Sequence, residues 1–222
     1  IGGESTRPGA ADVSTQDELE RVIPLIEAIR QRFACVISVD TSKAAVMSAA
    51  VQAGADMIND VRALQEPGAL QVAVAAQLPV CLMHMQGAPR SMQQAPHYQD
   101  VLTEVVQFLQ QRANECEQAG LLKQHIVLDP GFGFGKNLSH NYQLLAQLEQ
   151  LTALGYPLLA GMSRKSMIGQ LLSVSVNQRL AGSLACATIA AIKGARIIRV
   201  HDVKETVQAV RVVTAMQYGV EG

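Results

Sequence analysis

The chain has 222 residues, a formal net charge of −1, a hydrophobic content of 49% and a charged content of 17%. This length suits one large domain or two small ones, and the composition is that of a compact protein with a sizeable core. A nearly neutral chain offers no broad basic surface, which argues against nucleic acid as a partner. No apolar run reaches the ~18 residues of a membrane span and no signal sequence is visible, so we expect no membrane association and a cytoplasmic location.

The four cysteines lie far apart in the sequence and form no C-x-x-C pair: Cys35, Cys81, Cys116 and Cys186. Three of them fall in expected strands or apolar helices. We therefore predict reduced structural thiols rather than a metal site or a redox site.

The first strand is expected to end at Ile1, and a loop of the sequence GGESTRPG follows it. Ser14 with Asp17 resembles an N-terminal capping box, and the apolar spacing predicts a helix from there to about Phe33. Pro24 lies inside that helix, where a proline should introduce a kink or mark a later start. Because the chain begins within a strand and without Met, we expect an N-terminal segment to be missing from it.

Strands and helices alternate along the rest of the chain. Apolar runs predict further strands at 36–39, 57–58, 80–83, 126–128, 157–160 and 197–200. Helical patterns are expected at 44–53, 67–76, 98–119, 139–154, 177–193 and 203–217, with a long surface loop at 85–97.

This alternation, without a linker or a charge block, predicts a single α/β domain over residues 1–222 with a parallel sheet. A TIM-type (β/α)8 barrel has eight strands and typically ~250 residues. We therefore predict such a barrel, lacking its first strand–helix unit and most of its second strand. A doubly wound open sheet is the alternative.

Polar residues stand where each expected strand ends. They are Glu4, Ser5, Thr6, Arg7, Asp40, Asn59, Asp60, His84, Asp129, Ser163, Arg164, Lys165, Arg199 and His201. Any one of the Asp, Asn or Ser residues could simply cap a helix. In a barrel, however, the active site lies at the carboxyl ends of the strands, so the whole set predicts a functional site.

A glycine-rich loop, DPGFGFGK at 129–136, follows the strand at 126–128. Gly131, Gly133 and Gly135 allow positive φ angles and a close approach of the backbone to a ligand. The loop does not have the spacing of a phosphate-binding P-loop or of the dinucleotide fingerprint. Its leading Asp129 is therefore the residue of interest.

The residue types at the strand ends indicate a ligand with two unlike ends. Arg199 and His201 are two positions apart on an expected strand, so they should face one side, and with Arg7 they suit phosphate or pyrophosphate. A structural ion pair of Arg199 is the competing interpretation. Asp40 and Asp129 need a partner rich in N–H donors, such as the aminopyrimidinone edge of guanine or a pterin.

The remaining polar groups complete this sketch. Asn59 offers an amide to the same ring, and Lys165 can serve one of its carbonyl oxygens or ring nitrogens. Ser163 precedes a short helix whose N-terminus attracts carboxylate or phosphate. GMSRK resembles the nucleophile elbow G-x-S-x-G but lacks its last glycine, so we expect no covalent intermediate on Ser163. The histidines show no metal-ligand spacing, so we expect no built-in transition metal.

The motifs GGESTRPG, SVDTSK, IND, LMHMQG, DPGFGFGK, GMSRKS and RVHD follow one another over nearly the whole chain. In this order they resemble the bacterial dihydropteroate synthase family. The resemblance implies a (β/α)8 barrel and a transferase that joins 6-hydroxymethyl-7,8-dihydropterin pyrophosphate to 4-aminobenzoate, giving 7,8-dihydropteroate and pyrophosphate. It also implies assistance by Mg²⁺, inhibition by sulfonamides and a homodimer formed through the late helices.

The resemblance also implies roles for residues at matching positions. The pterin contacts would be Asp40, Asn59, Met83, Asp129, Phe134 and Lys165. The pyrophosphate contacts would be Arg7, Arg199 and His201. The aminobenzoate contacts would be Thr6, Pro8, Phe134, Ser163 and Lys165. The catalytic set would be Asp40, Asp129, Lys165, Arg199 and His201, acting by dissociative substitution without a protein nucleophile.

One departure from the family is expected to matter. The family's first strand and its loop, with an Asn that helps to place metal and pyrophosphate, would precede residue 1, so no metal ligand is assigned in this chain. Two alternatives to the synthase remain: a methyltransferase domain that binds methyltetrahydrofolate, and a truncated remnant that binds pterin without turnover.

Overall fold

The structure is a computed structural model that describes residues 1–7, 9–87, 92–93 and 95–220. Its strands are β1 (Ser38–Asp40), β2 (Met57–Asp60), β3 (Val80–Met83), β4 (Ile126–Asp129), β5 (Leu159–Ala160) and β6 (Ile197–Ile198). Its α-helices are α1 (Thr15–Arg32), α2 (Ala44–Gln52), α3 (Ala69–Ala76), α4 (Val101–Gln118), α5 (Leu138–Ala146), α6 (Leu148–Thr152), α7 (Ser166–Leu172), α8 (Leu180–Ile192) and α9 (Val203–Tyr218). Short 3₁₀ turns at Lys123–His125 and Val176–Gln178 complete the list.

Every strand pairs in parallel with the next strand along the chain. β1 to β4 form one sheet in sequence order, β5 pairs with β6, and a bridge from Leu128 to Leu158 joins the two groups. A further bridge, from Gly2 to Asp40, shows the expected strand end at the start of the chain. A doubly wound sheet reverses its strand order at a switch point, whereas this order runs one way. The fold is therefore of the TIM-barrel type, as predicted, and the doubly wound alternative is wrong.

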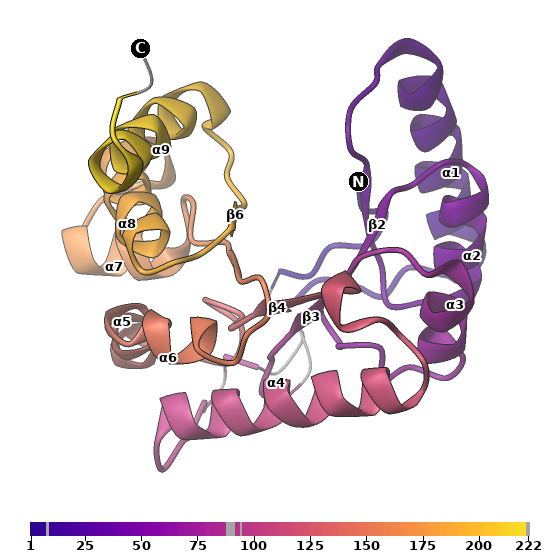
Figure 1. Cartoon of the computed structure of the whole chain (residues 1–222), viewed down its shortest axis with the longest axis horizontal. Coiled ribbons are helices and arrows are strands. Elements are labelled where there is room, and N and C mark those ends of the chain that lie inside the picture. The colour runs from indigo at the N-terminus through magenta and orange to yellow at the C-terminus, as the bar shows by residue number, and fades with distance from the viewer. Residues whose placement is uncertain (8, 88–91, 94, 221–222) are drawn as a thin grey trace.

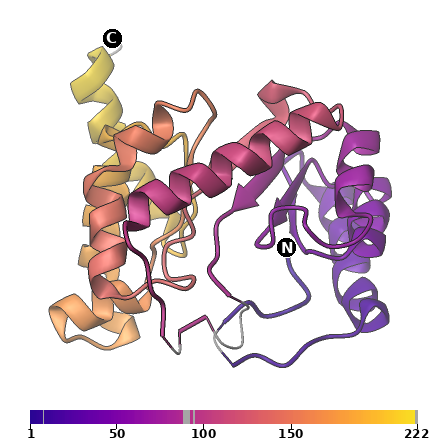
Figure 2. The ribbon, with the colours of Figure 1, turned by 90° about the horizontal axis from the view of Figure 1, so that it is seen from below.

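The helices lie outside the curved sheet. α1 to α3 cover one flank, α4 runs along the base and α5 to α9 cover the other flank (Figure 1, Figure 2). The main core lies between strands and helices and contains outward residues such as Ile58, Leu82 and Leu128. Because side chains alternate along a strand, the neighbours of these residues face the inside of the barrel. A small apolar layer fills that inside, consisting of Cys81, Val127 and Leu159 with Met57 and Ile197.

Helix α1 has the start that its sequence predicts. The Ser14 hydroxyl accepts a hydrogen bond from the backbone N–H of Asp17 at 3.1 Å, which satisfies one of the unpaired donors of the first turn. Val22 and Ile26 are fully buried on its inner face. Pro24 lies within the helix, which continues from Thr15 to Arg32, so the late start that a proline can cause is not observed.

Three predicted helix boundaries are wrong, each for a local reason. α3 begins after Gly68 rather than at Pro67, because Gly68 has a φ of 81° that no helical residue adopts. α4 begins after Asp100 rather than at Tyr98, because the Asp100 side chain accepts the backbone N–H of Thr103 and so caps the helix. Tyr98 precedes the helix and is buried. The helix expected at 139–154 is two helices, because Gln147 leaves the helical conformation between them (φ −119°, ψ 25°).

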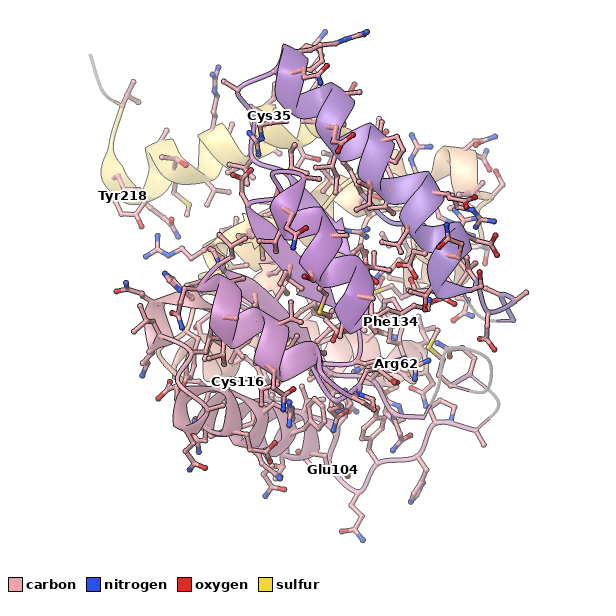
Figure 3. All side chains as sticks on the ribbon, turned by 90° about the vertical axis from the view of Figure 1, so that its right-hand side faces the viewer. Cys35, Arg62, Glu104, Cys116, Phe134 and Tyr218 are labelled. Carbon is pink, nitrogen blue, oxygen red and sulfur yellow. The ribbon has the colours of Figure 1, made fainter. Side chains whose placement is uncertain are left out.

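The cysteines follow the prediction within the described residues. Cys81, Cys116 and Cys186 are buried free thiols in a strand and two helices, while Cys35 is exposed (Figure 3). None of the helices in the described ranges is both long and apolar enough to cross a bilayer.

Gly131 is a position where only glycine fits the fold. Its φ is +69°, and an added Cβ would collide with the carbonyl oxygen of His84 on the neighbouring strand end. Gly155 has a similar φ of +79°, but the nearest atom to its Cβ would be the flexible end of Lys123, 3.7 Å away.

We expect Gly131→Ala to lower the free energy of unfolding by about 3 kcal/mol, because a backbone clash adds to the strain of a positive φ. Gly155→Ala, with the strain alone, should lower it by about 1 kcal/mol. Urea unfolding of both variants measures the difference. Equal losses would show that the approach of His84 to Gly131 is not a constraint.

Candidate active site

Four of the predicted site residues lie one step above the apolar layer inside the barrel. The register pairs Asp40 with Asn59 and Met83 with Asp129. Each is two positions beyond an inward residue of its own strand, so each faces inward at the carboxyl end. The structure therefore brings these residues to one rim, although their ligand roles remain predictions.

Asp40 and Arg199 join the first and the last strand ends of this rim. Nη2 of Arg199 lies 3.3 Å from Oδ2 of Asp40, across 159 positions of sequence. Burial raises the pKa of Asp40, and the charge of Arg199 and a hydrogen bond with Asn59 partly offset that rise. The Arg199 side chain is 62% exposed, and such an ion pair contributes little stability. Arg199 can therefore exchange this partner for a bound anion at small cost.

Asp129 and Lys165 are the second acid and base of the rim, and they interact through their charges. Oδ1 of Asp129 accepts the backbone N–H of Gly131 at 2.7 Å, while Nζ of Lys165 donates to the carbonyl of Phe132 at 2.6 Å. Burial raises the pKa of Asp129, against the opposing charge of Lys165. Burial also lowers the pKa of Lys165 to about 8. Lys165 lies over the ring of Phe134, with Nζ 4.7 Å from the ring centroid.

Ser163 and His201 contact each other rather than acting separately. Ser163 Oγ lies 3.0 Å from Nδ1 of His201 and accepts the His201 backbone N–H at 3.1 Å. β6 ends at Ile198, so Arg199 and His201 lie just beyond the strand rather than on it, and whether they share one face stays a prediction. Beyond the end of the strand, Arg199 contacts Asp40 and His201 contacts Ser163. A two-pronged ion pair from Arg164 to Asp202 connects the loops that carry Ser163 and His201.

Lys136 supports the glycine-rich loop, a role that the sequence did not predict. Its buried Nζ donates to the carbonyls of Gly131 and Phe134, both at 3.0 Å, and lies 2.9 Å from Nδ1 of His84. Burial lowers the pKa of Lys136 to about 7. Burial, followed by the charge of Lys136, lowers the pKa of His84 to about 2, so the neutral ring can accept a hydrogen bond from Nζ of Lys136. The sequence feature that could have indicated this role is the position of Lys136 directly after the three glycines of the loop.

A cavity of about 250 Å³ opens beside Asp40, and Thr6 lines it with Asp40. Its lining comprises Glu4, Ser5, Thr6, Ala10, Ala11, Asp12, Glu18, Asp40, Thr41, Ser42, Val61 and Arg62. A second cavity of about 120 Å³ includes Met83 and shares Arg62 with the first. Among the described residues, Phe134, Ser163 and Lys165 line neither cavity, so the structure does not place the predicted aminobenzoate contacts around a single hollow.

The loop residues of the prediction are only partly described. Arg7 is exposed, and its backbone N–H lies 3.4 Å from the hydroxyl of Ser5. Pro8 lies outside the described residues.

The family resemblance also implies Mg²⁺. Over the residues that the structure describes, no group of three or more His, Cys, Asp or Glu side chains is placed to hold a metal ion. Assistance by Mg²⁺ therefore stays a prediction, and no catalytic step is assigned to a metal.

Comparison with known proteins identifies the family. Pterin-binding enzymes match residues 1–201. The chain belongs to this family. It is 63% identical to the dihydropteroate synthase of Escherichia coli K12 over 215 residues, which is 97% of this chain and 76% of that protein. The family resemblance that the motifs predicted is thereby confirmed.

Solved structures of this family agree in fold and sequence. The dihydropteroate synthase of Yersinia pestis, solved with a sulfonamide drug, has a TM-score of 0.95 and 60% identity, covering 97% of this chain and 78% of that one. The enzyme of Xanthomonas albilineans, solved with 4-aminobenzoic acid, has a TM-score of 0.93 and 52% identity, covering 98% and 78%.

The burial of Lys136 predicts a pH-dependent stability. Between its pKa of about 7 in the folded chain and the value of 10.5 expected of an exposed lysine, the unfolded chain binds the additional proton. The free energy of unfolding should therefore rise with pH in this window, by up to ~1 kcal/mol per pH unit from this residue.

We expect Lys136→Met to lose this part of the slope between pH 7 and pH 9, and to be less stable throughout because its carbonyl partners lose their donor. Lys204→Met, at an exposed position of α9, is the control. Urea unfolding at several pH values gives both slopes. A Lys136→Met slope equal to that of the unmutated chain would contradict the lowered pKa of Lys136.

Proposed function

We propose that this chain acts as a dihydropteroate synthase by dissociative substitution. The transferred group is the 7,8-dihydropterin-6-ylmethyl group, its donor is the pyrophosphate ester, and its acceptor is 4-aminobenzoate. The C–O bond to the diphosphate breaks first and the diphosphate keeps the electron pair. The neutral amine then attacks the methylene carbon, a C–N bond forms, and the amine releases a proton. This is the transferase activity that the curated relatives carry, at up to 63% identity over most of the chain.

The observation that carries this mechanism is the pairing of acids and bases on one rim. Asp40 is half-buried and Asp129 is buried, and their ring-binding role needs N–H donors, which a pterin presents on its aminopyrimidinone edge. Asn59 and Met83 face the same interior, where they would contact the ring. Lys165 would donate to the ring and also stabilise the charge of Asp129.

The departing diphosphate requires cations rather than a nucleophile. Arg199 would leave its exposed contact with Asp40 and bind the diphosphate through its planar guanidinium. His201 and Arg7 would add donors from the neighbouring loops. Catalysis then rests on positioning and on electrostatic stabilisation of the leaving group.

The aminobenzoate would bind between the outer loops. Thr6, Pro8 and Phe134 would frame its ring, with Ser163 and Lys165 near its carboxylate. Ser163 is buried and bonded to His201, which suits a group that orients a substrate and not one that attacks it. Sulfonamides would compete at this position, since the Yersinia pestis structure contains such a drug.

The two alternatives make different predictions. A methyltransferase domain that binds methyltetrahydrofolate should not need an anion site, so pyrophosphate should neither displace nor protect its ligand. A remnant without turnover should bind pterin but form no dihydropteroate. Pyrophosphate competition and a direct assay of dihydropteroate formation therefore separate all three functions.

We expect Asp129→Asn to weaken pterin binding by about 1–3 kcal/mol, because the charge that faces the ring is lost while an oxygen remains for Gly131. Calorimetry with a dihydropterin ligand measures this change. Asp17→Asn, at an exposed position in the first turn of α1, is the matched control. Unchanged affinity of Asp129→Asn would contradict the proposed pterin contact.

We also propose a homodimer formed through the late helices. α8 and α9 pack against each other on one flank of the barrel (Figure 1). They leave large apolar side chains exposed: Ile189, Ile192, Val203, Val207, Val212, Met216 and Tyr218. Figure 3 shows Tyr218 at the outer end of α9. A second copy of the chain is the occupant that the family resemblance supports.

The double variant Val212→Asp/Met216→Asp should dissociate this dimer at least about a hundredfold more readily, because each carboxylate would be buried without a partner. Phe33→Asp/Val36→Asp replaces two equally exposed apolar residues near β1 and should not change the assembly. Light scattering over a dilution series measures both. A monomeric unmutated chain, or a dimer that survives the α9 substitutions, would refute the proposal.

A further inference from the structure

A three-residue ion network lies beside the cavity at Asp40 and has no role in the mechanism above. Nζ of Lys43 contacts Oε2 of Glu4 at 2.7 Å and Oε2 of Glu18 at 2.6 Å. Glu4 belongs to the loop that follows Gly2, Glu18 belongs to the first turn of α1, and Lys43 immediately precedes α2. One ammonium therefore connects three separate segments.

Glu18 makes this network more than a surface contact. Its side chain is fully buried, and its Oε1 has no hydrogen-bond partner among the described residues, although Glu18 lines the cavity with Thr6 and Asp40. A buried carboxylate requires a paired cation, because desolvation of an unpaired charge costs several kcal/mol. Lys43 is that cation, so it cannot leave Glu18 without a large loss of stability.

The side chain of Glu4 holds both ends of the loop that carries Thr6 and Arg7. While its Oε2 binds Lys43, its Oε1 accepts the backbone N–H of Val13 at 2.8 Å. The described residues between them, 5–7 and 9–12, therefore belong to a loop with both ends held on one carboxylate. Figure 1 shows this indigo segment running from the N-terminus alongside α1 to the start of that helix.

The base of the loop is packed as well as bonded. A Cβ at Gly3 would lie 2.8 Å from Cγ of Glu18, so the backbone of the loop rests directly on the buried side chain. Nη1 of Arg21 also donates to the carbonyl of Gly3 at 2.9 Å.

The other end of the network belongs to the strand end of Asp40. Lys43 follows Asp40 by three positions, in the turn that joins β1 to α2. Ser42, the residue before Lys43, donates its hydroxyl to Asp60 at the end of β2. The turn that carries the ammonium is thus held by the same strand ends that hold the predicted pterin contacts.

We propose that Glu4, Lys43 and Glu18 form a latch that positions the loop 5–12 over the strand ends for the second substrate. The proposal rests on the proposed function, in which Thr6 contacts aminobenzoate and Arg7 the diphosphate. None of the three latch residues contacts substrate; they are positioning residues. Glu4 is the residue to replace in a test of the latch, because Lys43 and Glu18 remain paired without it and the buried charge of Glu18 stays neutralised.

The test is Glu4→Ala in the full chain, compared with Glu4→Gln and with Glu149→Ala. Glu4→Ala should raise KM for aminobenzoate about tenfold, because charge-assisted hydrogen bonds that hold the loop are lost. The affinity for dihydropterin pyrophosphate, measured by calorimetry, should fall by a clearly smaller factor, because Arg7 is the one of its proposed contacts that the loop carries. Glu4→Gln keeps one acceptor oxygen, enough for one of the two partners of Glu4, and should recover part of the loss. Glu149→Ala removes an equivalent Lys–Glu pair on α6 and should change neither constant.

Hydrogen exchange of the amides in residues 5–13 gives a readout that needs no turnover. We expect faster exchange there in Glu4→Ala and unchanged exchange in β1 to β4. Unchanged exchange, or an equal loss of affinity for both substrates together with lower global stability, would overturn the latch. If the unmutated chain makes no dihydropteroate, the proposed function fails, and the exchange result still decides whether Glu4 holds the loop.

Discussion

The structure depends on the parallel pairing of each strand with the next one along the chain. This pairing curls the sheet until the ends of β1 and β6 come within ion-pair distance, where Arg199 meets Asp40 across 159 positions of sequence. All carboxyl ends then lie on one rim, and alternation along each strand decides which residues face inward. An apolar layer that includes Cys81, Val127 and Leu159 fills the inside of the barrel below the rim. The polar residues of the rim therefore lie above a packed interior.

Burial gives the rim its chemical character. It raises the pKa of Asp129 and lowers the pKa of Lys165 to about 8, while their opposite charges act against both shifts. Each group makes its hydrogen bond elsewhere: Asp129 accepts the backbone N–H of Gly131, and Lys165 donates to the carbonyl of Phe132. Neither therefore uses the other for all of its hydrogen bonds. A flat ligand with N–H donors and ring acceptors would satisfy both, which is the chemistry expected of a pterin.

Two lysines behind the rim hold its loops in similar ways. Lys136 binds carbonyl oxygens of the glycine-rich loop, and Lys43 binds two carboxylates at the base of the loop 5–12. In both places a single ammonium serves several acceptors, because its three protons can point in different directions. Loops that are held in this way can present substrate contacts without a helix or a strand of their own.

The sequence alone determined the alternation of elements, the TIM-barrel class, the family and the residue types at the strand ends. Local patterns carry this information: apolar period, caps such as Ser14, and motifs such as DPGFGFGK. The tertiary structure decided what depends on distant partners. It brought Asp40 to Arg199 and His201 to Ser163, and it gave Lys136 and Glu4 their distant partners. Contacts between residues far apart in the chain leave no spacing signal, because they arise only when the sheet curls and the loops fold over its rim.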